Sequence, residues 1–187
     1  KGGFLIYGGN VKFNYQNNLA VFLEAWNGYI YGDSIAVSYD KRVKQSFTYN
    51  HTKIKYFDGT RGYINYQTEY VNLFSGRNEL KWGVSDLNPM IIGNGSQIFD
   101  FVKFDFKYKS FRYTFLHGWL VLPKSTVQID SLVGGVYRKN AKYIAINRIG
   151  FNPTERLKIG ITQEIIYANR NVELSYLNPF LLWESAQ

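Results

Sequence analysis

The sequence predicts an all-β fold: an antiparallel transmembrane β-barrel, or a portion of one, with about eight or more meandering strands. Stretches of roughly ten residues have one apolar, aromatic-rich face and one polar face, and short and long connections alternate between them. The composition agrees, because aromatic residues make up 18% of the chain, with 16 Tyr and 14 Phe, whereas Pro occurs four times. This mixture favours pleated, half-exposed strands over helices.

Four hairpins are expected from alternating polar and apolar residues. Their strands are residues 3–16 with 18–30, 61–73 with 77–83, 102–108 with 111–119, and 141–151 with 155–166. Their turns are expected at 16–18, at 74–76, near Ser110 and at 152–154. Phe22 and Trp26 break the alternation of the first hairpin, whereas Lys103, Asp105 and Lys107 follow one another on a single face of the third.

Longer connections are expected at roughly 31–60, 84–98 and 122–140, at the end of the sheet opposite to the turns. Short turns at one end and long loops at the other are typical of outer-membrane barrels. Short strands at 35–39 and 45–49 and a short helix at 177–185 are also expected. We expect residues 1–187 to form a single barrel domain, an internal fragment of a larger barrel, because no signal peptide and no final aromatic-ended strand are recognised.

The composition also bears on partners and cofactors. The chain has no Cys, and His51 and His117 show no ligand spacing, so we expect no metal and no cofactor. The net charge of +8 suits anionic lipid headgroups or an acidic polymer. Nucleic acid is not expected as a partner, because the basic residues are spread over strands and loops, and the cluster Lys41-Arg42-Val43-Lys44 is interpreted as a solvated loop.

A soluble sandwich or lipocalin-like barrel would show the same alternation, so it stays an alternative. Two features favour the membrane. Aromatic residues gather toward strand ends, as interfacial girdles require. The charged face of Lys103, Asp105 and Lys107 also suits a wet lumen and excludes a dry core. No run of residues reaches the about 18 apolar residues of a spanning helix, so strands would have to span.

Four stretches carry a family resemblance: GTRGY at 59–63, GRNELKWG at 76–83, RLKIGITQE at 156–164 and LNPF at 177–180. Their order and spacing resemble the outer-membrane capsule assembly proteins of the Wzi type, especially the divergent versions of Bacteroidetes. The resemblance implies a large, monomeric, plugged barrel in the outer membrane of a Gram-negative bacterium, without enzymatic activity. It also implies binding of acidic capsular polysaccharide or exopolysaccharide, contact with outer-membrane lipid, and a part in attaching or organising the capsule.

Six polar residues lie on predicted lumen-facing positions within or near these stretches: Arg61, Glu69, Arg77, Glu79, Arg156 and Glu164. One interpretation is that their guanidinium and carboxylate groups bind sugar hydroxyls or uronic acids. The other is that they pair with one another and brace the lumen. Aromatic residues on the opposite parity are expected to form the membrane girdle: Trp82, Tyr108, Phe111, Tyr113 and Trp119.

Other positions and functions are also open. His117 shares the parity of the girdle, and sugar-stacking aromatics would be sought in the first long loop, at Tyr49, Tyr56 and Phe57. A porin-like or structural barrel without lectin activity is the main functional alternative. A glycoside hydrolase using two carboxylates, for example Glu69 and Glu164, is less favoured.

Overall fold

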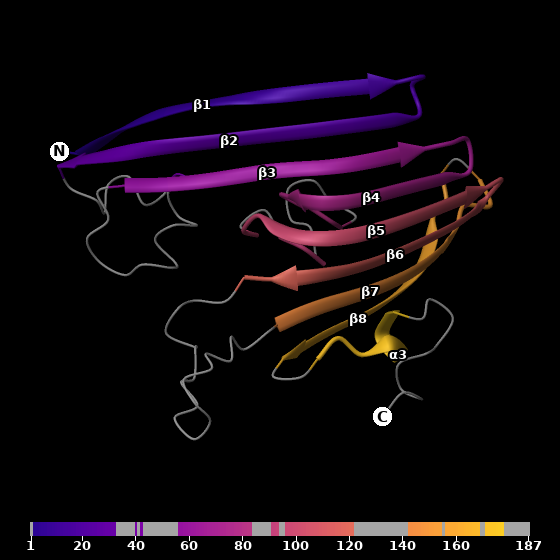
Figure 1. The fold of residues 1–187 in the computed structure, drawn as a ribbon. Helices are drawn as coiled ribbons and strands as arrows, with labels where there is room; N and C mark the ends of the chain where they lie inside the picture. Colours follow the sequence, from indigo (N-terminus) through magenta and orange to yellow (C-terminus); the bar gives the residue numbers. More distant parts are fainter. Residues whose placement is uncertain are drawn as a thin grey trace.

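The computed structural model describes residues 2–32, 40, 42, 56–83, 91–93, 96–121, 142–154, 156–168 and 171–177. Within these ranges eight strands form a single antiparallel sheet in sequence order, followed by a short helix (Figure 1). The strands are β1 (Gly2–Tyr15), β2 (Leu19–Gly32), β3 (Tyr56–Gln67), β4 (Val71–Asn78), β5 (Phe99–Tyr108), β6 (Phe111–Leu120), β7 (Lys142–Phe151) and β8 (Ile159–Ala168), and the helix is α3 (Leu174–Leu177). The sheet curves without closing, because β1 and β8 do not pair with each other. The predicted all-β meander is confirmed, and the sheet is consistent with a portion of a β-barrel.

Two of the predicted turns are confirmed. Gln16 and Asn17 both adopt positive φ angles, 48° and 57°, and the amide of Asn18 donates to the carbonyl of Tyr15. Asn tolerates this left-handed backbone better than most residues, which explains why the tight turn forms here. Lys109, with φ 50°, makes the corresponding turn between β5 and β6.

The turn predicted at residues 74–76 is wrong, because these residues lie inside β4. The chain reverses at Thr68 instead, whose amide donates to the Val71 carbonyl at 2.7 Å and whose hydroxyl accepts from the Val71 amide at 3.0 Å. Gly76 marks a close approach of two strands: at its φ of 150°, an added Cβ would lie 2.3 Å from the Gly62 carbonyl oxygen. From the sequence alone, a glycine needed for close contact between strands cannot be distinguished from a turn glycine.

Other predicted boundaries also move. The first long connection ends earlier than expected, because β3 begins at Tyr56. The strand expected at 77–83 ends at Asn78, and the returning strand of the last hairpin begins at Ile159 and not at 155. The predicted strands at 35–39 and 45–49, and the part of the predicted helix after Leu177, lie outside the described residues.

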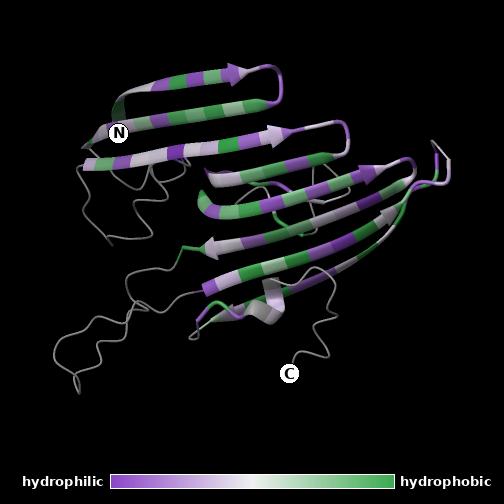
Figure 2. Cartoon of the chain, turned by 45° about the vertical axis from the view of Figure 1, so that its right-hand side comes forward, coloured by the Kyte–Doolittle hydropathy of each residue, from purple (hydrophilic) through white to green (hydrophobic). Residues whose placement is uncertain are grey.

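The sheet has two chemically different faces. The strand register places Val11, Leu23, Ile64, Leu73 and Ile161 on one face, called here the outer face, and all five are exposed. The alternation of hydrophobic and hydrophilic residues along the strands is visible in Figure 2. No helix within the described ranges is long and apolar enough to cross a membrane.

Exposed aromatic residues border the aliphatic middle of the outer face at both strand ends. Beside the short turns lie Tyr15, Tyr66, Tyr108, Phe111 and Phe151, and at the opposite ends of the strands lie Tyr29, Tyr31, Tyr56 and Trp119. An aliphatic band between two aromatic bands is the surface that a membrane-spanning barrel presents to lipid.

The opposite, inner face is partly covered by the connection that follows β4. Trp82 forms an isolated bridge with Ile92, and Ile92 packs with buried residues of β5, β6 and β7 such as Phe101, Leu116 and Ile146. Further along the same connection, Ile98 packs against Trp26, Ile30 and Phe57. The apolar core of the described residues thus forms largely between the sheet and a connection that lies on its inner face.

Candidate functional site

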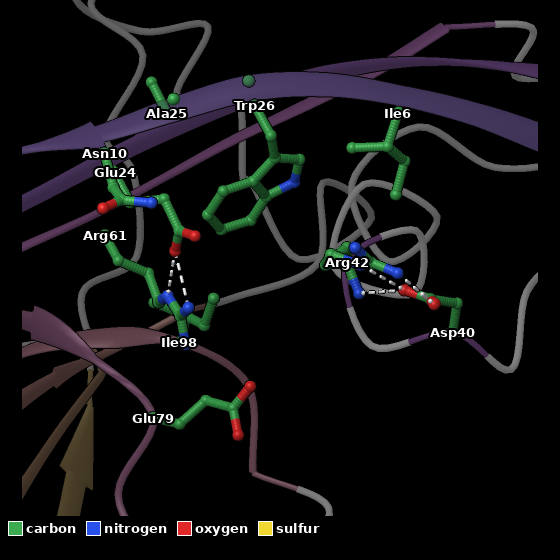
Figure 3. Close-up of a pocket in the computed structure, with 12 residues that line it drawn as sticks. Ile6, Asn10, Glu24, Ala25, Trp26, Asp40, Arg42, Arg61, Glu79 and Ile98 are labelled. Carbon is green, nitrogen blue, oxygen red and sulfur yellow. Dashed lines mark hydrogen bonds and ion pairs between the residues drawn. The ribbon is translucent and has the colours of Figure 1, made fainter.

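A cavity of 550 Å³ lies on the inner face of β1, β2 and β3 (Figure 3). It is called here the inner pocket, and it is defined by Asn10, Glu24, Trp26, Asp40, Arg42, Arg61, Glu79 and Ile98. Strands β1, β2 and β3 supply Asn10, Glu24, Trp26 and Arg61. The connection after β2 supplies Asp40 and Arg42, and the connection after β4 supplies Glu79 and Ile98. The inner pocket therefore has a sheet floor and walls made by segments distant in sequence.

Arg61 and Glu24 form an ion pair across β2 and β3, where they are direct register partners. The Arg61 Nε lies 2.6 Å from Glu24 Oε2, and the side chains are 32% and 25% exposed. The Arg61 guanidinium also lies 6.0 Å from the centre of the Phe22 ring and 5.9 Å from that of Trp26. The two aromatic residues that break the alternation of β2 thus flank the cation and hold it in place.

Trp26 provides a buried hydrogen-bond donor in the inner pocket. Its side chain is 6% exposed, and its indole lies against Gly59, where an added Cβ would be 2.4 Å from Trp26 Cζ2. The indole lies between the Arg61–Glu24 pair and the Asp40–Arg42 pair (Figure 3). Its Nε1 has no acceptor among the described residues. Because an unsatisfied buried N–H is unfavourable, this group is suited to donate to a bound oxygen.

Asp40 and Arg42, from the first long connection, line the same cavity as Trp26. Arg42 donates from Nε and Nη2 to the two carboxylate oxygens of Asp40, at 3.1 and 2.9 Å. This bidentate bond raises the pKa of Arg42 above its usual value. With Glu24 and Glu79, the inner pocket holds three carboxylates and two guanidiniums, so its charge is nearly balanced. Such a mixture of donors and acceptors suits a ligand rich in hydroxyl groups.

The structure brings together two of the six residues proposed from the sequence, Arg61 and Glu79. Arg77 is not lumen-facing: it pairs with Gly62 in the register, lies on the outer face, and forms a bidentate ion pair with Asp100 at 2.5 and 2.9 Å. The reason is the mistaken turn at 74–76, since a shift of one residue moves every side chain to the other face.

The other three predicted residues lie apart from the inner pocket. Glu69 is exposed in the turn between β3 and β4, and Arg156 is exposed in the connection before β8, so neither belongs to a lumen-facing strand position. Glu164 lies on the inner face of β8 and lines a different cavity, of 290 Å³, together with Lys142.

Four of the five predicted girdle aromatics lie on the outer face: Tyr108, Phe111, Tyr113 and Trp119. Trp82 does not, because the strand ends before it and its bridge to Ile92 places it against the inner core. His117 has the outer parity but is 1% exposed and shares a hydrogen bond of 2.9 Å with the Tyr167 hydroxyl.

The aromatic residues expected to stack on sugars from the first long loop occupy other places. Phe57 is buried against Trp26 and Ile30, and Tyr56 begins β3 and donates a hydrogen bond to Asn27. Tyr49 and His51 lie outside the described residues. Among the side chains that the structure describes, no group of three or more His, Cys, Asp or Glu comes together to hold a metal ion.

The sequence did not identify Glu24, Trp26, Asp40 or Arg42 as site residues. A signal existed for Trp26, since an aromatic residue on the polar parity of a strand must contact something on the inner face. Arg42 belongs to the basic cluster at 41–44, interpreted from the sequence as a solvated loop, but it lines the inner pocket and pairs with Asp40. No sequence pattern marks Asp40.

The meandering sheet, its exposed apolar outer face and an inner face that carries polar cavities beside a covered apolar core define the class of outer-membrane β-barrel proteins. Over residues 8–179 the chain matches the family described as capsule assembly protein Wzi. The chain belongs to this family, whose members are outer-membrane capsule assembly proteins of Gram-negative bacteria, and the predicted resemblance is confirmed. No curated protein and no solved structure matches the chain.

Proposed function

We propose that this chain is part of a monomeric outer-membrane barrel that binds a surface polysaccharide and helps to attach the capsule to the cell, without catalysing a reaction. We assign sugar binding to the inner pocket. The observation that carries this assignment is the buried Trp26 Nε1, which has no acceptor among the described residues and borders a cavity lined by carboxylates and guanidiniums. Sugar hydroxyls both donate and accept, so they can satisfy these groups together.

The family and the surface chemistry support the remaining parts of the proposal. Membership of the capsule assembly family supplies the biological context. The exposed aliphatic residues of the outer face, such as Val11 and Ile161, are in contact with outer-membrane lipid in this proposal. The net charge of +8 favours an acidic polysaccharide over a neutral one.

A plugged barrel is favoured over an open diffusion pore. Trp82, Ile92 and Ile98 place a connection on the inner face, where an open porin would hold water. In planar bilayers the full-length protein is therefore expected to give little steady current. Large, stable single-channel conductance would contradict this part of the proposal.

The binding proposal is tested with the full-length protein in detergent on an array of acidic and neutral polysaccharides. The wild type should bind at least one acidic polysaccharide. Trp26→Phe, which keeps a ring but removes the donor, should bind it about tenfold more weakly. Trp119→Phe is the matched control, because Trp119 lies on the outer face, and its affinity should be unchanged. Absence of binding to every polysaccharide would overturn the proposal.

A further inference from the structure

A third cavity on the inner face, of 300 Å³, has a different chemistry from the inner pocket. It lies on β6, β7 and the start of β8, near their short connections, and is called here the basic pocket. Its polar side chains and its aromatic residue are Trp82, Arg112, Thr114, Arg148, Asn152 and Lys158. Three cations and no carboxylate line it, in contrast to the nearly balanced charges of the inner pocket.

The cations of the basic pocket form no ion pair within the described part of the chain. Asp105, a nearby carboxylate on the inner face, is occupied: it lies 2.8 Å from Lys103 Nζ and accepts a 2.8 Å hydrogen bond from Thr114. Lys107 adds a further positive charge directly opposite Arg112 in the register. Like charges at facing positions repel one another, so an anion bound among these cations would relieve that repulsion.

Two glycines lie beside the arginines of the basic pocket, and one of them, Gly160, is covered by a guanidinium. Gly150 lies opposite Arg112, and Gly160 lies opposite Gly150 on the next strand. An added Cβ on Gly160 would lie 3.3 Å from Arg148 Nη2 and 3.4 Å from its Nε, so the guanidinium covers the glycine. The guanidinium of Arg148 therefore lies over the backbone of Gly160, and Arg112 and Lys158 line the same cavity.

We propose that the basic pocket is an anion site for the carboxylate of an acidic sugar, gripped by Arg112, Arg148 and Lys158. Guanidinium groups bind carboxylates through two parallel hydrogen bonds. Thr114 and Asn152 supply groups for sugar hydroxyls, and Trp82 borders the cavity as an aromatic wall. The sugar part of this assignment rests on the proposed function, but the anion part follows from the cluster itself. The site would select charged residues of a polysaccharide, which the inner pocket, with its balanced charges, does not.

The test is a binding titration of the full-length protein in detergent. The probes are a glucuronic-acid-containing oligosaccharide, its carboxyl-reduced neutral form, and inorganic phosphate. The acidic oligosaccharide should bind at least about tenfold more tightly than the neutral form, and Arg148→Gln should remove most of that difference. Arg156→Gln is the matched control, because it is the same substitution at an arginine that lies two residues before Lys158 and does not line the cavity. This control should change the affinity by less than about twofold.

A variant that keeps every charge adds an independent arm. Gly160→Val should displace the Arg148 guanidinium and weaken binding of the acidic oligosaccharide several-fold.

Unfolding of the ligand-free protein tests whether Arg148 binds the ligand or only stabilises the fold. Arg148→Gln should leave the unfolding midpoint unchanged or raise it, because it relieves repulsion. A lowered midpoint with unchanged oligosaccharide affinity would make Arg148 a brace and overturn the proposal.

The remaining outcomes separate this site from the inner pocket. Tighter binding of phosphate than of the acidic oligosaccharide would overturn the assignment to a carboxylate. Equal loss of affinity in Arg148→Gln and Arg156→Gln would overturn the site itself. If Trp26→Phe is silent but Arg148→Gln abolishes binding, the basic pocket stands and the assignment of sugar binding to the inner pocket fails. If only Trp26→Phe weakens binding, the proposed function stands and the basic pocket is not a site.

Discussion

The ion pair of Glu24 and Arg61 allows the geometry of the inner pocket to be tested by stability. Exposed ion pairs contribute about 0.2–1 kcal/mol, and hydrogen bonds to charged groups about 1.5–3 kcal/mol. With side chains 32% and 25% exposed and an Nε to Oε2 distance of 2.6 Å, this pair lies between the two cases. We expect a coupling free energy of about 1–2 kcal/mol between the two side chains.

The two single substitutions should differ in a defined order. Glu24→Gln removes the ion pair but leaves the guanidinium of Arg61 beside Phe22 and Trp26. Arg61→Gln removes the ion pair and both cation–π contacts, so it should destabilise the protein by about 0.5–1 kcal/mol more than Glu24→Gln does. The free energies come from urea unfolding of the full-length protein in micelles, including the double variant, with Glu69→Gln as the exposed control. Additive single effects, or a larger loss for Glu24→Gln, would refute the arrangement.

Three further predictions concern the outer face, the contact of Trp26 with Gly59, and the turn between β3 and β4. Val11→Arg places a charge on the outer face and should lower the free energy of unfolding in bilayers by about 2–4 kcal/mol. Asn14→Arg places the same charge on the inner face and should change that free energy by less than about 1 kcal/mol. Equal losses would contradict the assignment of faces. Gly59→Val should expel the Trp26 ring and shift its fluorescence toward the red as it becomes hydrated; an unchanged spectrum would contradict the close contact. Thr68→Ala should lower the unfolding free energy by about 1 kcal/mol, because it removes the hydroxyl acceptor of the β3–β4 turn; an unchanged free energy would contradict a stabilising role of this hydrogen bond.

Much of the sheet follows from alternation alone. The hairpins that turn at Gln16-Asn17 and at Lys109 are predicted correctly, because residues on the two sides differ clearly and the turns are short. The β3–β4 hairpin is displaced because Gly76 has two possible roles, as a turn residue or as a point of close strand contact. The close contacts of Gly76 with Gly62 and Tyr63 on the neighbouring strand identify the second role, and sequence periodicity does not contain that information.

The site is predicted less completely than the sheet for a related reason. Arg61 is predicted correctly because it occupies an inward-facing position of β3, among alternating polar residues. Glu79 follows the end of β4 directly and also lines the inner pocket. Trp26 disturbs the same pattern, and its role becomes clear only from the Gly59 slot on the next strand. Asp40 comes from a segment distant in sequence from Trp26, so no local pattern could place the two residues around one cavity.

Retention of capsule by living cells tests the central claim most directly. A strain lacking the native protein would express either the full-length wild type or a variant combining Trp26→Phe with Arg61→Gln, at equal amounts in the outer membrane. The ratio of cell-bound to released polysaccharide is then measured. We predict that the wild type restores cell-bound capsule and that the variant releases it into the medium. Equal retention by the two proteins would contradict polysaccharide binding at the inner pocket.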